Sequence, residues 1–80
     1  MVEYPVSPVD GVVGRQVADL GLPPEATVNV IVRGAQAIPP AGTVRIKAGD
    51  RLHLLVRREV AREVAVLVYR WEAGDTARWT

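Results

Sequence analysis

The 80-residue sequence predicts a small α+β domain, in which a mixed or antiparallel sheet of short strands packs against two helices. Two observations lead to this class. About half of the residues (49%) are hydrophobic, which is enough for one packed core. The hydrophobic pattern alternates every second residue along most of the chain and follows a helical period in two segments. The predicted order is strand, helix, three or four short strands, helix.

The N-terminal segment predicts a strand and then a short helix. Val2, Tyr4 and Val6 alternate with polar residues and prolines, as in a strand with one buried face, and Pro5 restricts this strand to a sheet edge. The residues Val13, Val17 and Leu20 then form one helical stripe of at most about two turns. Gly21 and the prolines at 23 and 24 end this helix.

The middle of the chain predicts the sheet. The segment 27–33 alternates most clearly, with three valines on one face and Asn29, Ile31 and Arg33 on the other. A glycine turn at 34 leads to a brief return strand at 36–38, and a further short strand is expected at 44–47. The segment 51–57 predicts another strand whose inward residues are Leu52, Leu54 and Val56.

The last element predicted is a helix from about 59 to 71. Its apolar stripe consists of Val60, Val64, Leu67, Val68 and Trp71. A strand over 64–69 is the competing interpretation, and the length of the pattern favours the helix. We therefore expect one domain over residues 1–73, followed by a disordered tail at 74–80 that contains Trp79.

The composition excludes several classes of protein. The net charge of +1, with acids and bases interspersed, gives no basic surface for nucleic acid or for an anionic membrane. No apolar run approaches the roughly 20 residues of a membrane span, and the N-terminus lacks the pattern of a signal peptide. The bases at 45, 47, 51, 57 and 58 are interpreted as a solvated face. The aspartates lie in turns or on a helix surface, and no nucleophile–base set is present, so we expect no enzymatic activity.

The small size of the chain predicts a partner. A domain this short buries only roughly 60% of its unfolded surface. There is no cysteine for a disulfide, and the single histidine, His53, cannot form a zinc site alone. We therefore expect a homodimer. His53 could respond to pH near neutrality, although a hydrogen-bonded structural histidine is the simpler interpretation.

Five segments, in this order and spacing, carry a resemblance to a known family: VGR at 13–15, LGLP at 20–23, VIVRG at 30–34, IPP at 38–40 and AGDRL at 48–52. The chain resembles, from about residue 2 to 71, the C-terminal (TrkA-C) subdomain of RCK/TrkA-type regulators of potassium transport. Its C-terminal part is similar to copies appended to bacterial potassium/proton antiporters. The dinucleotide-binding half of such regulators, with its Gly-x-Gly-x-x-Gly motif, is missing from this sequence, so no cofactor is expected.

The resemblance implies a cytoplasmic, ligand-sensing regulatory domain at the inner face of the membrane, dimeric and attached to or associated with a transporter. In some members the effector is cyclic di-AMP, held at the dimer interface by an arginine and by an Ile-Pro step five residues later. Arg33, Ile38 and Pro39 match that spacing. Arg33 would bind a phosphate, and Ile38 with Pro39 would pack against a purine. The alternative is a purely structural dimerisation module, with Arg33 an ion-paired surface residue, Ile38 a core residue and Pro39 the end of a strand.

Overall fold

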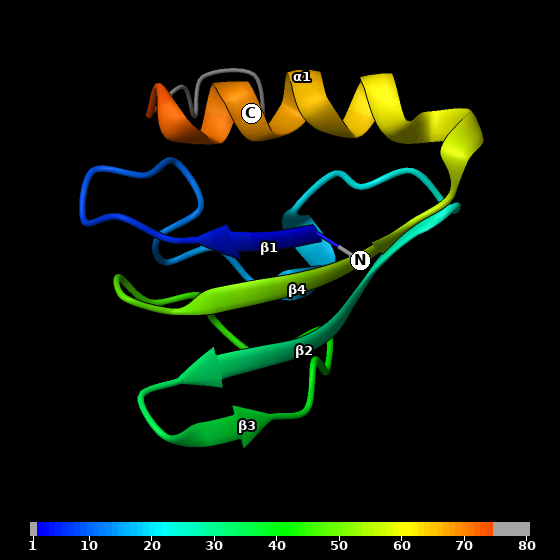
Figure 1. The fold of residues 1–80 in the computed structure, drawn as a ribbon. Coiled ribbons are helices and arrows are strands. Elements are labelled where there is room, and N and C mark those ends of the chain that lie inside the picture. Colours follow the sequence, from blue (N-terminus) through cyan, green and yellow to red (C-terminus); the bar gives the residue numbers. More distant parts are fainter. Residues whose placement is uncertain (1, 75–80) are drawn as a thin grey trace.

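The structure is a computed structural model that describes residues 2–74 (Figure 1). Its elements in chain order are β1 (Val2–Pro5), η1 (Val17–Asp19), β2 (Ala26–Arg33), β3 (Gln36–Ile38), β4 (Arg51–Val56), η2 (Arg58–Val60) and α1 (Ala61–Glu72). The four strands form one sheet in the order β1-β4-β2-β3, and all neighbouring strands are antiparallel. This arrangement confirms the predicted α+β class. It also confirms Pro5 in an edge strand, because β1 pairs only with β4 among the described strands.

A bulge in β2 changes which residues face the core. The register with β4 shifts between Val28 and Val30, so that Val28 lies opposite Leu54 and Ile31 lies opposite Leu52. Val28 and Ile31 therefore share the core face, and the strict alternation expected over 27–33 is wrong at Asn29. Ile31 is completely buried. Arg33, two residues further, lies on the same sheet face as Ile31.

The core lies on one face of the sheet. It is formed by side chains from the strands, from the loops before β2 and β4 and from α1, which runs beside β1 (Figure 1). The completely or almost completely buried apolar residues include Val12, Leu20, Ile31, Ile46, Leu52, Leu54 and Trp71. Leu52 and Leu54 thus face inward as predicted, whereas Val56 is only half-buried.

The first predicted helix is reduced to the single 3-10 turn η1. The Val17 N–H donates to the Val44 carbonyl at 2.9 Å and the Ala18 N–H donates to the Gly42 carbonyl at 3.0 Å, instead of to a preceding helical turn. Gly14, with a φ of 84°, and the extended Gln16 prevent a continuous helix from Val13. Two residues of the predicted apolar stripe still contribute to the core, because Leu20 is buried and Val17 packs against the core.

The strand expected at 44–47 does not join the sheet. This segment pairs instead with residues 14–18, through an isolated bridge between Gln16 and Arg45. The Ile46 N–H donates to the Arg15 carbonyl at 2.8 Å, and the Ile46 side chain is buried. The segment is extended as predicted, but it pairs with a loop, so the sheet has four strands within the described residues.

The final helix is confirmed, with η2 forming its first turn. Val60, Val64 and Trp71 are buried, and Leu67 and Val68 pack partly against the core. The Trp71 ring contacts Tyr4 edge-on with a centroid distance of 5.4 Å. The Tyr4 hydroxyl donates to the buried Asp10 carboxylate, and the Gly11 N–H donates to the Trp71 carbonyl at 2.8 Å. These contacts attach the end of α1 to β1 and to the loop after it.

None of the helices within residues 2–74 is long and apolar enough to cross a membrane. Of the predicted tail at 74–80, Gly74 is described and its N–H donates to the Trp71 carbonyl at 3.0 Å, whereas residues 75–80, including Trp79, lie outside the described residues.

Candidate functional site

The β2–β3 hairpin brings the three predicted ligand residues to one edge of the sheet. Arg33 lies opposite Gln36, and the turn between them is Gly34-Ala35. Gly34 has a φ of 61°, whereas no other residue type in the described chain has a positive φ. A positive φ at the first of two turn residues is the pattern of a type II′ turn, which matches the twist of an antiparallel hairpin.

Arg33 and Ile38 occupy the same face of this hairpin. Ile38 pairs with Ile31, and Arg33 lies two residues beyond Ile31 on the same side of the sheet. Ile38 packs partly against the core, and the Pro39 that follows it is exposed. The structure therefore places the cation and the half-buried Ile38 on one face of the hairpin, and the exposed Pro39 directly follows Ile38 at the β3 edge.

Arg33 is held by a buried carboxylate. Its Nε and Nη2 atoms donate to Oδ1 and Oδ2 of Asp50, each at 2.8 Å. Nη2 also donates to the Arg45 carbonyl at 2.9 Å. Asp50 is 1% exposed, and the Arg33 side chain is 30% exposed. Such a two-point contact fixes the plane and direction of the guanidinium group.

The electrostatics of this pair strengthen the contact. Burial alone would raise the pKa of Asp50, but the hydrogen bonds and charge of Arg33 and the Lys47 backbone N–H outweigh burial and lower this pKa below its ordinary value. The hydrogen bond to Asp50 in turn raises the pKa of Arg33 above its ordinary value. The Lys47 N–H donates to Oδ2 at 2.9 Å, so the carboxylate also holds the turn before β4.

The remaining edge of the guanidinium group is the part that can meet a ligand. Among the described residues, no hydrogen bond uses Nη1 of Arg33. Within the described chain, Nη1 is therefore the guanidinium nitrogen without an acceptor. Nε and Nη2 already donate to Asp50, so a contact to an anion through Nε would require the carboxylate to move.

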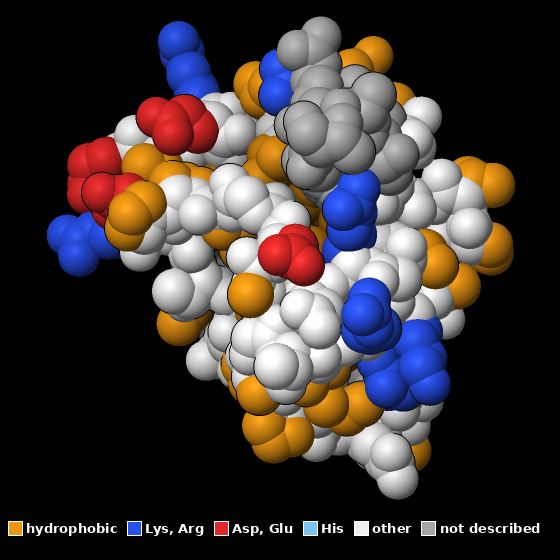
Figure 2. Space-filling view, turned by 180° about the vertical axis from the view of Figure 1, so that it is seen from behind, with side chains coloured by type: hydrophobic (Ala, Val, Ile, Leu, Met, Phe, Trp, Pro, Cys, Tyr) orange, Lys and Arg blue, Asp and Glu red, His pale blue; other side chains and the backbone are white. Residues whose placement is uncertain are grey.

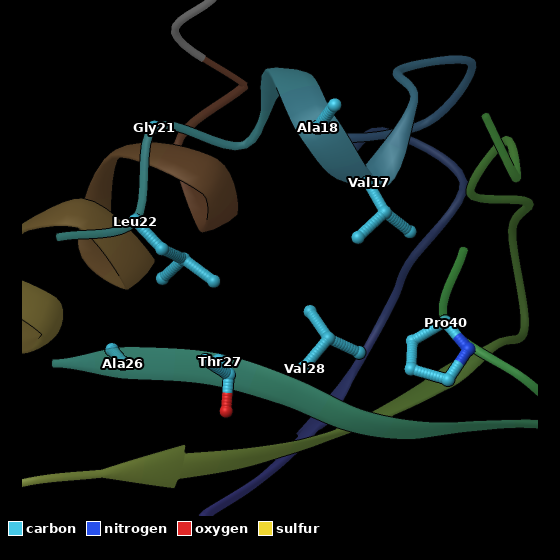
Figure 3. Close-up of a pocket in the computed structure, with 8 residues that line it drawn as sticks. All are labelled: Val17, Ala18, Gly21, Leu22, Ala26, Thr27, Val28 and Pro40. Carbon is cyan, nitrogen blue, oxygen red and sulfur yellow. The ribbon is translucent and has the colours of Figure 1, made fainter. Parts of the chain in front are cut away.

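An apolar groove lies beside the hairpin, between η1 and the first half of β2 (Figure 3). Val17 and Leu22 point into it from one side, Val28 lies on the other, and Pro40 closes one end (Figure 3). Its lining is completed by Ala18, Gly21, Ala26 and Thr27. Arg33, Ile38 and Pro39 do not line it, but Pro40 directly follows Pro39. This groove is not predictable from the sequence pattern. Its only signal was the LGLP segment opposite an IPP segment, and no local pattern shows that the two lie together.

His53 lies on the open face of the sheet. Its Nε2 is 3.2 Å from Oε2 of Glu3, its neighbour across the β1–β4 register. The histidine side chain is 26% exposed. This contact supports the interpretation of a structural histidine with a polar partner.

The basic residues of the second half of the chain include two that are separated by the length of β4. Arg51 begins β4 and Arg57 directly follows its last residue, and Arg57 pairs with Glu59 at 3.1 Å. On the face seen in Figure 2, Lys and Arg side chains gather on one flank, while basic and acidic side chains alternate at the opposite flank. Within residues 2–74, no group of three His, Asp or Glu side chains is arranged to hold a metal ion.

The fold and the hairpin define a small antiparallel α+β domain with an oriented arginine at one sheet edge, and the comparisons identify its family. The model of the TrkA-C domain family matches residues 1–68, so the chain belongs to that family. A curated relative, the Trk system potassium uptake protein TrkA homolog 1 of Methanosarcina mazei, is 31% identical over 64 residues. The match covers 80% of this chain and 14% of that protein.

A solved structure has the same fold. It is described as an RCK domain with cda, and it superposes with a TM-score of 0.57 at 21% sequence identity. The superposition covers 80% of this chain and 93% of the solved chain. The RCK/TrkA-C resemblance drawn from the five sequence segments is thus confirmed.

Proposed function

We propose that this chain is a cytoplasmic effector-binding domain that regulates a potassium or cation/proton transport protein, and that it binds its effector between two copies of itself. Membership of the TrkA-C family supports the regulatory role, and the potassium uptake relative supports the transport system. The solved RCK domain with a bound molecule, cda, supports a small effector on this fold.

The observation that carries the proposal is the orientation of Arg33. Its guanidinium group is held at two points by Asp50, while Nη1 has no hydrogen bond within the described chain and lies on the same face as Ile38. A cation that is held in place before binding loses little side-chain entropy when an anion arrives. The adjoining Ile38 and Pro39 supply an apolar surface for a flat ring.

We propose cyclic di-AMP as the effector. A twofold-symmetric ligand with two phosphates matches a twofold interface, in which each copy contributes one Arg33 and one Ile-Pro step. Each copy then contributes one cation, Arg33, to a ligand that has two phosphates. So small a number of cations suits a chain whose net charge is only +1. The role of the domain is to transfer the free energy of this binding to the attached transport protein.

The test is a calorimetric titration of the purified domain with cyclic di-AMP, with ATP, AMP and NADH as comparison ligands. We expect saturable binding at one ligand per two chains. Arg33→Ala leaves Asp50 buried without a counter-charge, so a neutral pair of similar shape, Arg33→Gln with Asp50→Asn, is the better variant. We expect it to fold and to lose binding, while Arg57→Ala at the other end of β4 keeps it.

Each result has a defined meaning. No heat with cyclic di-AMP on a folded protein removes this ligand. Binding of another nucleotide keeps the regulatory function and changes its effector. No response to any of the four ligands favours the structural dimerisation module, in which Arg33 serves only as the partner of Asp50.

A further inference from the structure

The outer side of α1 carries apolar residues that the core does not use. Six consecutive residues of α1, from 64 to 69, are apolar, so the middle of the helix is hydrophobic around its whole circumference. Val64 is buried in the core, but Val66 is 52% exposed and Tyr69 is 72% exposed. A helix that is apolar on every side is typical of one with neighbours on more than one side.

A groove runs along the same helix. It lies between α1 and the ends of β1 and β4, and its lining is apolar: Val2, Val56, Ala61, Val64, Ala65 and Val68. Ala61 and Ala65 lie one turn apart on its helical wall, and their small side chains leave room for the backbone of a second helix. Tyr69 follows Ala65 by one further turn. The helix therefore presents the exposed ring of Tyr69 towards its C-terminal end and the groove at Ala61 and Ala65 towards its N-terminal end.

The charges of α1 differ between its two sides. At about 100° per residue, Arg62, Tyr69 and Glu72 lie within about a quarter-turn of the direction of Ala65, and Glu63 and Arg70 lie on the opposite side. Glu63 in the first turn and Arg70 in the last turn follow the helix dipole. Arg62 and Glu72 oppose it, since each stands near the helix end of its own sign. Neither of them forms an ion pair with another described residue.

We infer that this face binds the same face of a second copy, with the two α1 helices antiparallel across a twofold axis near Ala65 and Val66. This packing places each Tyr69 in the groove of the other copy, beside its Ala61 and Ala65. It also brings each Arg62 next to the Glu72 of the other copy and next to the negative end of the other helix. The surface therefore fits a second copy of the chain. A twofold rotation places the Tyr69 of each copy at the groove of the other, and the Arg62 of each copy at the Glu72 of the other.

This contact is separate from the proposed effector interface. α1 lies beside β1, and the hairpin with Arg33 ends in β3, and these two strands form the opposite edges of the sheet (Figure 1). The pairing of α1 does not need an effector. The two interfaces can therefore be tested independently.

The experiment is sedimentation velocity of this chain without ligand, over a range of protein concentrations. We expect a dimer that Tyr69→Asp converts to a monomer. Val9→Asp, which adds the same charge at a residue that is 78% exposed in the loop after β1, is the control and should remain dimeric. Ala65→Arg fills the groove from its helical side and should also give a monomer. Circular dichroism checks that each variant is folded.

A charge exchange tests the antiparallel arrangement. Arg62→Glu and Glu72→Arg each place like charges together at two symmetric positions, so each should weaken the dimer about tenfold. The double variant restores opposite charges and should return the dissociation constant to within about threefold of the original. A wild-type chain that stays monomeric, a Tyr69→Asp dimer, or a double variant no tighter than the single ones would each overturn the inference. A calorimetric titration of folded Tyr69→Asp with cyclic di-AMP tests the effector proposal independently of this contact.

Discussion

At the scale of single residues, the pair of Arg33 and Asp50 connects stability with the proposed site. Asp50 accepts hydrogen bonds from Arg33 and from the Lys47 N–H, and its own backbone carbonyl accepts one from the Val6 N–H at 2.8 Å. One carboxylate residue thus joins β2, the turn before β4 and the segment after β1. Because the same carboxylate orients the guanidinium group, a change at Asp50 alters both folding and the direction of Arg33.

We expect Asp50→Asn to lower the free energy of unfolding at pH 7 by about 2–3 kcal/mol. Breaking a buried pair typically costs 3–5 kcal/mol, and the partly exposed Arg33 reduces this value. The folded pKa of Asp50 lies below its ordinary value of 3.8, so its contribution is complete above that pH and is lost as the pH falls through the folded pKa. The difference between the wild-type chain and the variant should therefore shrink below about pH 4.

Urea unfolding at a series of pH values measures this difference. Asp19→Asn, at an exposed residue of η1, is the matched control and should change stability little at any pH. An equal loss at pH 7 and pH 3 would show that Asp50 acts through its shape and not through its charge.

At the scale of elements, the β2–β3 hairpin forms as its local sequence predicts, whereas the first predicted helix does not. The turn at Gly34-Ala35 forms where the sequence places it, because glycine accepts a positive φ without a steric cost. The segment from Val13 has a helical stripe but also contains Gly14, and it forms only one 3-10 turn. Its N–H groups bond to the 42–46 segment, a partner that lies about 30 residues away in the chain.

We expect Gly34→Val to lower stability by about 1–2 kcal/mol and Gly34→Asn to lower it less. A Cβ at this position meets no atom within 4 Å, so the cost comes from the φ of 61° and not from a clash. Asparagine tolerates this conformation, while a β-branched side chain does not. Urea midpoints at a fixed pH measure both variants, and equal values for the two would argue against a required positive φ.

At the scale of the whole molecule, the sheet order places two proposed contacts far apart. β3 carries the effector hairpin at one edge, and β1 with α1 carries the groove at the other. An 80-residue chain has a small core, and a second copy is a way to bury additional apolar surface. Effector binding at one edge and pairing of α1 at the other would make an assembly in which each copy has two neighbours.

Dimerisation through α1 predicts that stability depends on protein concentration. We expect the urea midpoint of the wild-type chain, measured without ligand, to rise when the protein concentration is increased a hundredfold, because mass action favours the folded dimer. The midpoint of Tyr69→Asp should not change. If both midpoints are independent of concentration, the folded chain does not depend on a second copy for its stability.

The sequence by itself determined the fold class, the strands 27–33, 36–38 and 51–57 to within a residue or two, the final helix and the family. These features follow from local period and turn chemistry, which each segment carries alone. The tertiary structure decided the bulge at Asn29, the pairing of 44–47 with a loop, and the partners of Arg33 and Tyr4. These depend on which distant segments meet, and a side chain such as Asp50 is recognised as a partner only when the chain has brought it within hydrogen-bonding distance.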